Sequence, residues 1–336
     1  MFRKAQWNAL RMAGILLIAA LQGCTCNQVQ PAIVNERYGS HERNVLDFWQ
    51  AESQTPTPVM VYIHGGGFTT GSKDQVGGAL VAECIEAGIS VAACSYRYAT
   101  QAVYPGPLLD CARAVQYLRH NADRFNIDPD KMAAVGDSAG GITALWIGYQ
   151  NNLADPESED PVSRESTRLA AVGVFDAPCS LDPRYIRWLL GGRAYEHPSI
   201  PILFGAETQP CGLDAEALYP YYLNASPISH LSADDPPTFM YYSEPEEGLS
   251  GDPNSADCGS WETCHVCYPS YGQQLEGYPL PGEGIHHPWF GWALAEQLET
   301  QGIVHEYHHI SDYGQSSPAA QVFKELVDFL LLHTSG

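Results

Sequence analysis

The fold is decided by Met132-Ala133-Ala134-Val135-Gly136-Asp137-Ser138-Ala139-Gly140-Gly141, a short apolar run that passes into small residues around a serine. The first four residues have the pattern of a strand that is buried on both faces, as the strands of parallel sheets are. Glycines then flank the serine on both sides, and a helical pattern follows. The stretch therefore predicts a strand that turns directly into a helix.

The same alternation of buried strands and helices continues along the chain. Strands are expected at 59–63, 89–94, 132–135, 170–175, 238–242 and 303–308. Apolar residues recur at helical spacing within 76–87, 108–118, 290–298 and 322–330. This order predicts an α/β protein with a mostly parallel, twisted sheet and helices on both faces. No internal repeat or linker is evident, so we expect residues 24–336 to form one domain.

The serine motif carries the first chemical prediction. Gly136-x-Ser138-x-Gly140 after a buried strand matches the nucleophile elbow, in which a tight turn exposes a serine hydroxyl at the carboxyl edge of a sheet. The helix that begins beside it directs N–H groups toward any negative charge that develops there. Asp137 is interpreted as a member of the turn.

A second glycine motif, His64-Gly65-Gly66-Gly67, also follows a predicted strand. Consecutive glycines leave backbone N–H groups uncovered, and such groups can converge on an oxyanion. We predict that Gly66 and Gly67 form an oxyanion hole with the N–H of Ala139, worth about 3 kcal/mol per donor. His64 is interpreted as a structural anchor of this loop. Together the two motifs predict acyl-transfer chemistry.

Three stretches resemble a known family: Tyr62-Ile63-His64-Gly65-Gly66-Gly67-Phe68, Ser95-Tyr96-Arg97-Tyr98 and Val135-Gly136-Asp137-Ser138-Ala139-Gly140-Gly141. The chain is similar over roughly 36–330 to the α/β-hydrolase esterases with an HGGG oxyanion loop, the hormone-sensitive-lipase-like and bacterial feruloyl/acetyl-esterase group. The resemblance is closer in the first half. It implies the α/β-hydrolase fold and a serine carboxylic-ester hydrolase with a Ser-His-acid triad, an acyl-enzyme, and neither metal nor organic cofactor.

The resemblance places the acid of the triad just after the strand at 238–242. By register Glu246 takes that position, in Tyr242-Ser243-Glu244-Pro245-Glu246-Glu247. A cysteine-rich insertion, near 247–282, then delays the next helix-opening segment. Glu283, which immediately precedes that segment, is the alternative acid. Glu246 is preferred because a loop that leaves the sheet edge directly is better positioned.

The base is expected after the last strand. His309 is preferred because it lies nearest the carboxyl end of that strand, and His308 is the alternative base. His305 is expected inside the strand. His286 and His287 are interpreted as loop residues, with contact to substrate as a lesser alternative.

Charge and length exclude several function classes. The 336 residues include 39 Asp and Glu against 17 Lys and Arg, a net charge of −22. Nucleic-acid binding needs a basic surface, which this balance does not supply. No apolar run reaches the roughly 20 residues of a membrane-spanning helix. A small-molecule ester is the expected partner, with no nucleic acid and no membrane contact beyond the N-terminus.

The N-terminus has the pattern of an export signal. Arg3, Lys4 and Arg11 precede a short apolar run, so residues 1–23 are predicted to be a signal peptide. The run ends at Leu21-Gln22-Gly23-Cys24, which resembles a bacterial lipobox, so lipidation of Cys24 would anchor the protein in the cell envelope. A plain cleaved signal, giving a periplasmic or secreted protein, is the alternative.

Ten cysteines agree with an oxidising compartment. Cys258, Cys264, His265 and Cys267 lie close together in the insertion. They could bind zinc, but in an exported protein a loop held by disulfides is the preferred interpretation, with no metal.

The sequence predicts a substrate class and leaves two alternative functions. Short-acyl or aryl esters are expected, with access shaped by 176–237. An amidase or peptidase on the same fold is one alternative. The other is a binding lipoprotein of the envelope whose second half has lost the acid or base.

Overall fold

The structure is a computed structural model that describes residues 29–206, 212–247, 259–266, 272–274, 278–314 and 318–334. The predicted signal at 1–23 and Cys24 lie outside these residues. The described strands form an eight-stranded sheet in the order β1-β2-β4-β3-β5-β6-β7-β8. They are β1 (Ile33–Arg37), β2 (Val45–Trp49), β3 (Thr57–Ile63), β4 (Ser90–Cys94), β5 (Ile127–Asp137), β6 (Ala171–Phe175), β7 (Thr238–Tyr242) and β8 (His305–His309).

The sheet is parallel from β4 through β8, as the alternation of strands and helices predicted. All six expected strands are confirmed. Their ends differ from the prediction by at most two residues, except that β5 begins at Ile127, five residues before the expected start. Ile63 at the end of β3 pairs with Gly136 of β5, so the chain leaves both strands at the same edge of the sheet. The two glycine motifs therefore start side by side, which is what their proposed cooperation requires.

The first two strands were not predicted from the sequence. β1 pairs antiparallel with β2, and β2 pairs antiparallel with β4, so together they extend the parallel sheet at one side. Both are five residues long, and β1 is largely exposed. A short exposed strand such as β1 carries little of the apolar pattern that identified the others, and in the buried β2 that pattern is interrupted by Asp47.

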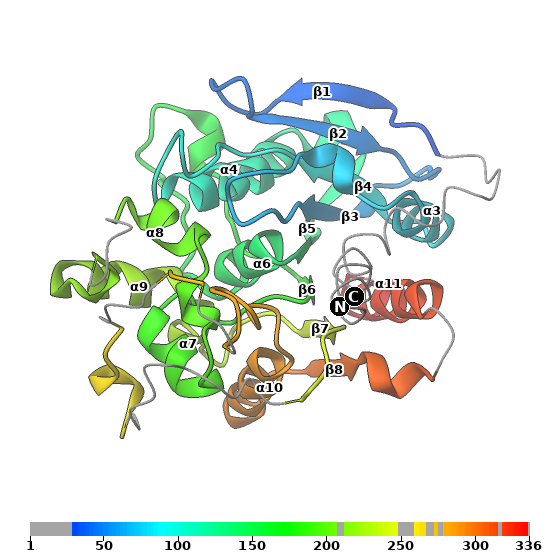
Figure 1. Ribbon diagram of the computed structural model, residues 1–336. Coiled ribbons are helices and arrows are strands. Elements are labelled where there is room, and N and C mark those ends of the chain that lie inside the picture. The colour runs from blue at the N-terminus through cyan, green and yellow to red at the C-terminus, as the bar shows by residue number, and fades with distance from the viewer. Residues whose placement is uncertain are drawn as a thin grey trace, which may run out of the picture.

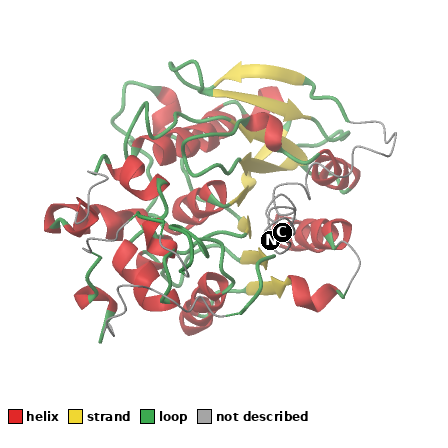
Figure 2. Cartoon of the chain, viewed as in Figure 1, coloured by secondary structure: helices red, strands yellow, loops and turns green. Residues whose placement is uncertain are grey.

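Helices cover both faces of the sheet, as Figure 1 and Figure 2 show. One face holds α3 (Gly78–Glu86) and α11 (Ala319–Thr334), which contact each other. The other holds α4 (Gly106–His120), α6 (Ala139–Tyr149) and α10 (Trp289–Gln301). The helical expectations at 76–87, 108–118, 290–298 and 322–330 are confirmed. Each face buries its own apolar cluster against the strands.

Shorter elements complete the chain. The segment between β6 and β7 contains α7 (Pro183–Leu190), α8 (Ser199–Phe204) and α9 (Tyr219–Ala225), and α5 (Ala122–Phe125) precedes β5. Single 3₁₀ turns lie at Lys73–Gln75, Pro161–Arg164, Ala194–Glu196, Gly212–Asp214, Glu216–Leu218, Pro227–Ser229, Trp261–Thr263 and Ile310–Tyr313.

The predicted cysteine-rich insertion lies in part within the described residues. Cys264 is disulfide-bonded, and the loop held by disulfides stays a prediction because Cys258 and Cys267 lie outside the described residues. Cys84, Cys94, Cys111 and Cys179 are free and buried. No cluster of three or more His, Cys, Asp or Glu side chains within the described ranges could hold a metal ion. In the same ranges no helix combines the length and apolarity needed to cross a bilayer.

Helix α6 makes a direct test of the fold possible, because all eleven of its residues are buried. Leu145→Ala removes a side chain with 0% exposure and leaves a cavity, so we expect it to lower the free energy of unfolding by about 2–5 kcal/mol. Leu332→Ala in α11 is the control: Leu332 is 72% exposed, and its loss should cost less than about 0.5 kcal/mol. Urea denaturation measures both, and equal costs would contradict the placement of α6.

Candidate active site

Ser138 occupies the sharp turn between β5 and α6. Its φ of 49° and ψ of −117° are sparsely populated for a residue with a side chain. A Cβ on Gly136 would lie 2.4 Å from the backbone carbon of Gly140, and a Cβ on Gly140 would lie 1.9 Å from the carbonyl oxygen of Ile63. Larger residues at either glycine would push the turn apart, so the elbow geometry depends on both.

The glycine loop after β3 packs directly against this elbow. A Cβ on Gly65 would lie 2.3 Å from Oδ2 of Asp137. The Gly65 N–H and the Tyr62 hydroxyl both donate to Oδ1 of Asp137, at 3.1 and 2.6 Å. Asp137 is therefore part of the turn, as interpreted from the sequence, and it also fastens the glycine loop to the elbow.

The backbone of Gly66 and Gly67 has positive φ, at 103° and 58°. Both values favour glycine. The N–H groups of these two residues donate to no other group within the described parts of the chain. Ala139 is the first residue of α6, where helix N–H groups lack partners within the helix. These three amides remain our predicted oxyanion donors.

His64 does not take part in proton transfer at Ser138. It is fully buried, stacks on Tyr96 with ring centroids 4.2 Å apart, and its Nδ1 lies 2.7 Å from the Gly65 carbonyl oxygen. Burial lowers the pKa of His64 to about 4. It is a neutral anchor of the loop, as interpreted from the sequence.

The side chain beside the serine is His286. Its Nε2 lies 2.8 Å from Oγ of Ser138, within hydrogen-bond distance. His286 lies in the segment that leads into α10, between β7 and β8 in the chain. The hydroxyl can donate to Nε2 when the imidazole is neutral, which is the arrangement that a general base requires.

A carboxylate faces the other nitrogen of the same ring. Oε1 of Glu244 lies 3.7 Å from Nδ1 of His286. Burial lowers the pKa of His286, but the nearby charge of Glu244, with weaker contributions from Asp176 and Asp137, outweighs it and raises the pKa above the usual value. Ser138, His286 and Glu244 thus form a connected chain of a hydroxyl, an imidazole and a carboxylate.

His309, the base expected from the sequence, does not reach Ser138. Its Nδ1 accepts from the Ser311 backbone N–H at 3.3 Å and lies 2.7 Å from the Ser311 hydroxyl. Nε2 is left to donate to the Glu244 carbonyl oxygen at 2.8 Å. The structure therefore corrects this expectation: His309 holds the backbone of Glu244. His308, the alternative base, faces Glu306 and Glu325 instead.

The predicted acids are also displaced from the imidazole beside Ser138. Glu246 is exposed and lies 3.8 Å from Nδ1 of His309, whereas Glu283 is exposed and accepts from the Leu280 N–H. Glu244, which faces His286, follows β7 directly, as the acid was expected to do. It precedes the predicted Glu246 by two residues, and Glu246 faces His309 instead.

The segment that carries Glu244 is held from both neighbouring strands. Asp176, at the end of β6, accepts from the Ser243 N–H at 2.6 Å and from its hydroxyl at 2.7 Å. His309, at the end of β8, binds the next carbonyl from the other side. Neither role was foreseen from the sequence, because both depend on which strands become neighbours.

His286 was missed for a comparable reason. It follows the insertion in the chain. The sequence signal that could have identified it is its position just before Pro288-Trp289-Phe290, where the next helix begins.

The insertion is held in place by a buried ion pair between Arg193 and Glu196, in which Nε and Oε1 are 2.9 Å apart. Glu196 accepts from the Gly272 N–H at 2.6 Å, and the Gly282 N–H donates to the Arg193 carbonyl at 2.9 Å.

His197 forms another wall of the site. A Cβ on Gly67 would lie 3.5 Å from its Cε1, and a Cβ on Gly282 would lie 2.9 Å from its Cα. Burial, together with the charge of His286, lowers the pKa of His197 to about 4. The ring is therefore neutral near pH 7.

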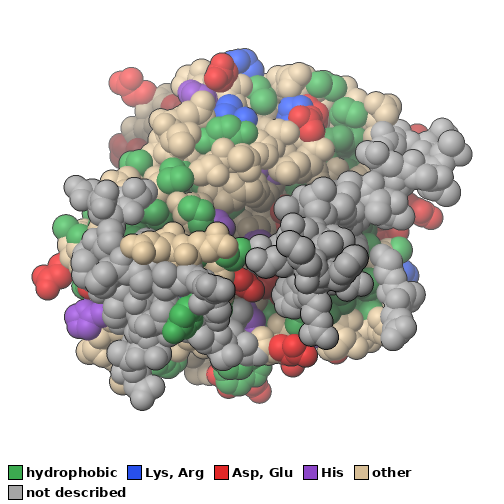
Figure 3. Space-filling model, viewed as in Figure 1, with side chains coloured by type: hydrophobic (Ala, Val, Ile, Leu, Met, Phe, Trp, Pro, Cys, Tyr) green, Lys and Arg blue, Asp and Glu red, His purple; other side chains and the backbone are tan. Residues whose placement is uncertain are grey.

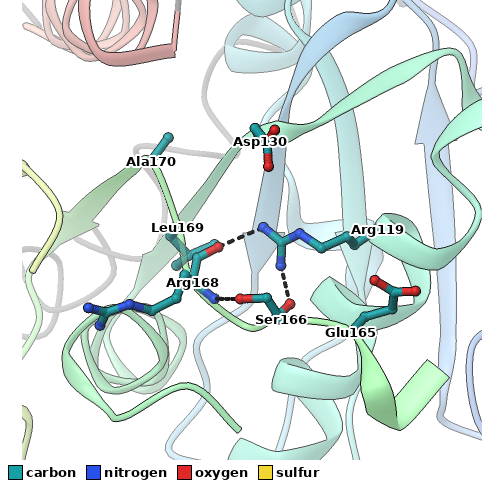
Figure 4. Close-up of a pocket in the computed structure, with 7 residues that line it drawn as sticks. All are labelled: Arg119, Asp130, Glu165, Ser166, Arg168, Leu169 and Ala170. Carbon is teal, nitrogen blue, oxygen red and sulfur yellow. Dashed lines mark hydrogen bonds between the residues drawn. The ribbon is translucent and has the colours of Figure 1, made fainter. Parts of the chain in front are cut away.

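A separate cavity of about 230 Å³ lies at the amino ends of β5 and β6 (Figure 4). Its Arg119 donates to the carbonyl oxygens of Ser166 and Arg168. Asp130 lies near the amino end of β5, whereas Ser138 follows its carboxyl end. The cavity is thus remote from the serine.

Acidic side chains are spread over the viewed surface in Figure 3. This distribution follows from the excess of Asp and Glu in the sequence.

Several known proteins share sequence with this chain. The chain is 30% identical over 214 residues to LipM of Mycobacterium tuberculosis, named a probable carboxylic ester hydrolase, which covers 61% of this chain and 46% of LipM. It is 32% identical over 136 residues to ethyl acetate hydrolase of Pseudomonas putida, covering 38% of this chain and 43% of that protein. The chain thus spans less than half the length of either relative.

Solved structures share the fold at lower identity. A truncated form of a carbohydrate esterase from gut microbiota superposes with a TM-score of 0.65 at 18% identity, over 93% of this chain and 99% of that one. Esterase 2 of Thermogutta terrifontis, in a form phosphoramylated by tabun, gives a TM-score of 0.57 at 19% identity, over 90% and 95%. The family model BD-FAE matches residues 46–249, more than half of the chain. The protein therefore has the α/β-hydrolase fold and belongs to the BD-FAE family.

Proposed function

We propose that this protein is a serine carboxylic-ester hydrolase. The observation that carries the proposal is the 2.8 Å contact between Oγ of Ser138 and Nε2 of His286, with Glu244 on the far side of the ring. Membership of the BD-FAE family and the similarity to proteins named as ester hydrolases support it. A complete set of nucleophile, base and acid argues against a binding protein that has lost its catalytic groups.

The first half of the proposed reaction forms an acyl-enzyme. Ser138 gives its proton to His286 Nε2 as its oxygen attacks the ester carbonyl. Glu244 stabilises the imidazolium that results. The N–H groups of Gly66, Gly67 and Ala139 donate to the carbonyl oxygen as it becomes negative. His286 then gives the proton to the leaving alkoxide, which departs as an alcohol.

The second half repeats these steps with water. His286 takes a proton from water, and the hydroxide attacks the acyl group on Ser138. The tetrahedral intermediate collapses, and the proton returns to Oγ of Ser138. These steps use groups of the chain itself and require neither a metal nor an organic cofactor.

We expect small esters with short acyl or aryl groups as substrates. The name of one relative, ethyl acetate hydrolase, agrees with a short acyl group. Peptides and other amides are a second possible class, since the same groups can attack an amide. Parallel assays of an ester and its amide analogue separate the two classes.

Labelling with a fluorophosphonate ester tests the nucleophile and its base. We expect wild-type protein to be labelled at Ser138 and Ser138→Ala to remain unlabelled. His286→Ala should slow labelling by about 10²–10⁴-fold, because the general base is lost. His309→Ala should slow it much less, since the ring of His309 binds Ser311 and the Glu244 carbonyl oxygen and makes no hydrogen bond to Ser138 within the described residues.

Mass spectrometry of the labelled peptide gives the rates. Circular dichroism of each variant shows whether the fold is retained. Absence of label on folded wild-type protein, or a larger effect of His309→Ala than of His286→Ala, would refute the assignment.

The pH dependence tests the acid. His286 must be neutral in the free enzyme, so kcat/KM should rise with pH as the imidazole loses its proton. Because Glu244 raises the pKa of His286, we expect the midpoint at or above 6.5. Glu244→Gln removes the stabilising charge, so the midpoint should move to lower pH and the plateau should fall.

Glu246→Gln is the matched control for this profile. Its side chain is 63% exposed and lies beside His309, so the midpoint should stay where it is in wild type. A shift on Glu246→Gln with none on Glu244→Gln would restore the original prediction for the acid. Initial rates of p-nitrophenyl acetate hydrolysis between pH 5 and 9 give both midpoints.

We also propose that residues 1–23 direct export and that Cys24 carries a lipid anchor. The proposal is supported by the basic residues, the apolar run and the terminal Gly23-Cys24. Mass spectrometry of the mature N-terminus after expression in a bacterium should find a lipid-modified Cys24. An unmodified N-terminus at another residue would favour the plain cleaved signal.

A further inference from the structure

His197 lies between the two parts of the proposed reaction centre. On one side it approaches Gly67, where an added Cβ would lie 3.5 Å from its Cε1. On the other it approaches Gly282, where an added Cβ would lie 2.9 Å from both its Cα and its Cδ2. Gly282 precedes His286 by only four residues. The ring therefore borders both the loop of the oxyanion donors and the segment of the base.

Nδ1 of His197 forms hydrogen bonds with Ser199. The backbone N–H of Ser199 donates to Nδ1 at 3.3 Å, and the Ser199 hydroxyl lies 2.5 Å from the same atom. A backbone N–H can only donate, so Nδ1 acts as an acceptor and carries no proton. The neutral ring must then carry its proton on Nε2.

The second nitrogen of the ring, Nε2, is the one that carries the proton. Nε2 of His197 makes no hydrogen bond to any residue that the structure describes, and the side chain is partly exposed. The low pKa of His197 keeps the ring neutral, so this N–H is a fixed donor across the range in which His286 can act as a base.

The position of His197 decides which part of an ester it can face. In the proposed tetrahedral intermediate the reacting carbon holds the Ser138 oxygen, the oxyanion, the leaving oxygen and the acyl group. Gly67 is placed at the oxyanion, and His286 is placed at the leaving oxygen. Because His197 approaches both Gly67 and the segment that leads to His286, we place it at the edge between the oxyanion and the leaving oxygen, which is the alcohol side and lies opposite the acyl group.

We infer that His197 is a specificity-determining residue that donates its Nε2–H to a hydrogen-bond acceptor on the alcohol part of the ester. This inference rests on the proposed function and names the preferred alcohols: those with an ether or hydroxyl oxygen near the ester bond. A purely alkyl alcohol would cover the donor without pairing it, and an unpaired polar group lowers affinity.

Two acetates of equal size test the inference. Butyl acetate and 2-methoxyethyl acetate differ only in that an ether oxygen replaces one methylene group. The measured quantity is kcat/KM for the methoxyethyl ester divided by that for the butyl ester. His197→Phe keeps an aromatic ring but has no donor, so we expect this ratio to fall roughly 3- to 10-fold relative to wild type.

Two further variants complete the experiment. His120→Phe is the matched control: it makes the same replacement at a histidine of α4 that contacts Glu165, and it should keep the wild-type ratio. His197→Gln retains an amide N–H and should recover part of the preference. If His197→Phe does not fold, His197→Gln alone tests the inference. Its ratio should fall below that of wild type, but by less than the roughly 3- to 10-fold expected for a site without a donor.

The outcomes separate the two levels of the proposal. An unchanged ratio in folded His197→Phe overturns the role of His197. An equal fall in kcat for both esters also overturns it, because it would place the ring at the oxyanion instead of the alcohol. If wild-type protein hydrolyses neither ester and takes no fluorophosphonate label, the proposed function itself fails, and the inference fails with it.

Discussion

The site depends on a close approach of backbone to backbone. The start of α6 lies against the end of β3 so tightly that a single methyl group at Gly140 would lie 1.9 Å from a carbonyl oxygen. Adjacent parallel strands bring these two ends to one edge, and glycine allows them to touch. The contact sets the serine beside the amides of the glycine loop. Asp137 then ties the loop in place through Gly65.

From the sequence, the central fold and half of the site could be predicted. Buried strands have a local signature, since both faces need apolar residues, and each of the six predicted strands is present. Ser138 and the glycine loop were also accessible, because tight turns restrict their residues locally. β1 and β2 were not. β1 is short and largely exposed, and β2 is buried but its apolar run is interrupted by Asp47, so both carry a weak pattern.

The base and the acid could not be predicted in the same way. Histidine and glutamate tolerate almost any local backbone, so their neighbours along the chain say little about their role. His309 and His286 both lie near Glu244, and only the tertiary structure shows which of them reaches Ser138. The expectation of a base after the last strand failed because the segment before α10 provides the imidazole. Arg193 and Glu196, which hold the preceding insertion, come from a part of the chain some ninety residues earlier, and no local pattern connects them to His286.

Ser138 and His286 are carried by parts of the structure that differ in stability, and this difference has a consequence for the effect of heat. The nucleophile lies between an eight-stranded sheet and a fully buried helix. The imidazole of His286 lies in a loop whose ends are held by Ile285 and Phe290, which pack on the core, and by polar contacts around Arg193. Loops open at a lower free-energy cost than the strands of a core. We therefore expect heating to separate His286 from Ser138, with loss of activity, before the sheet itself unfolds.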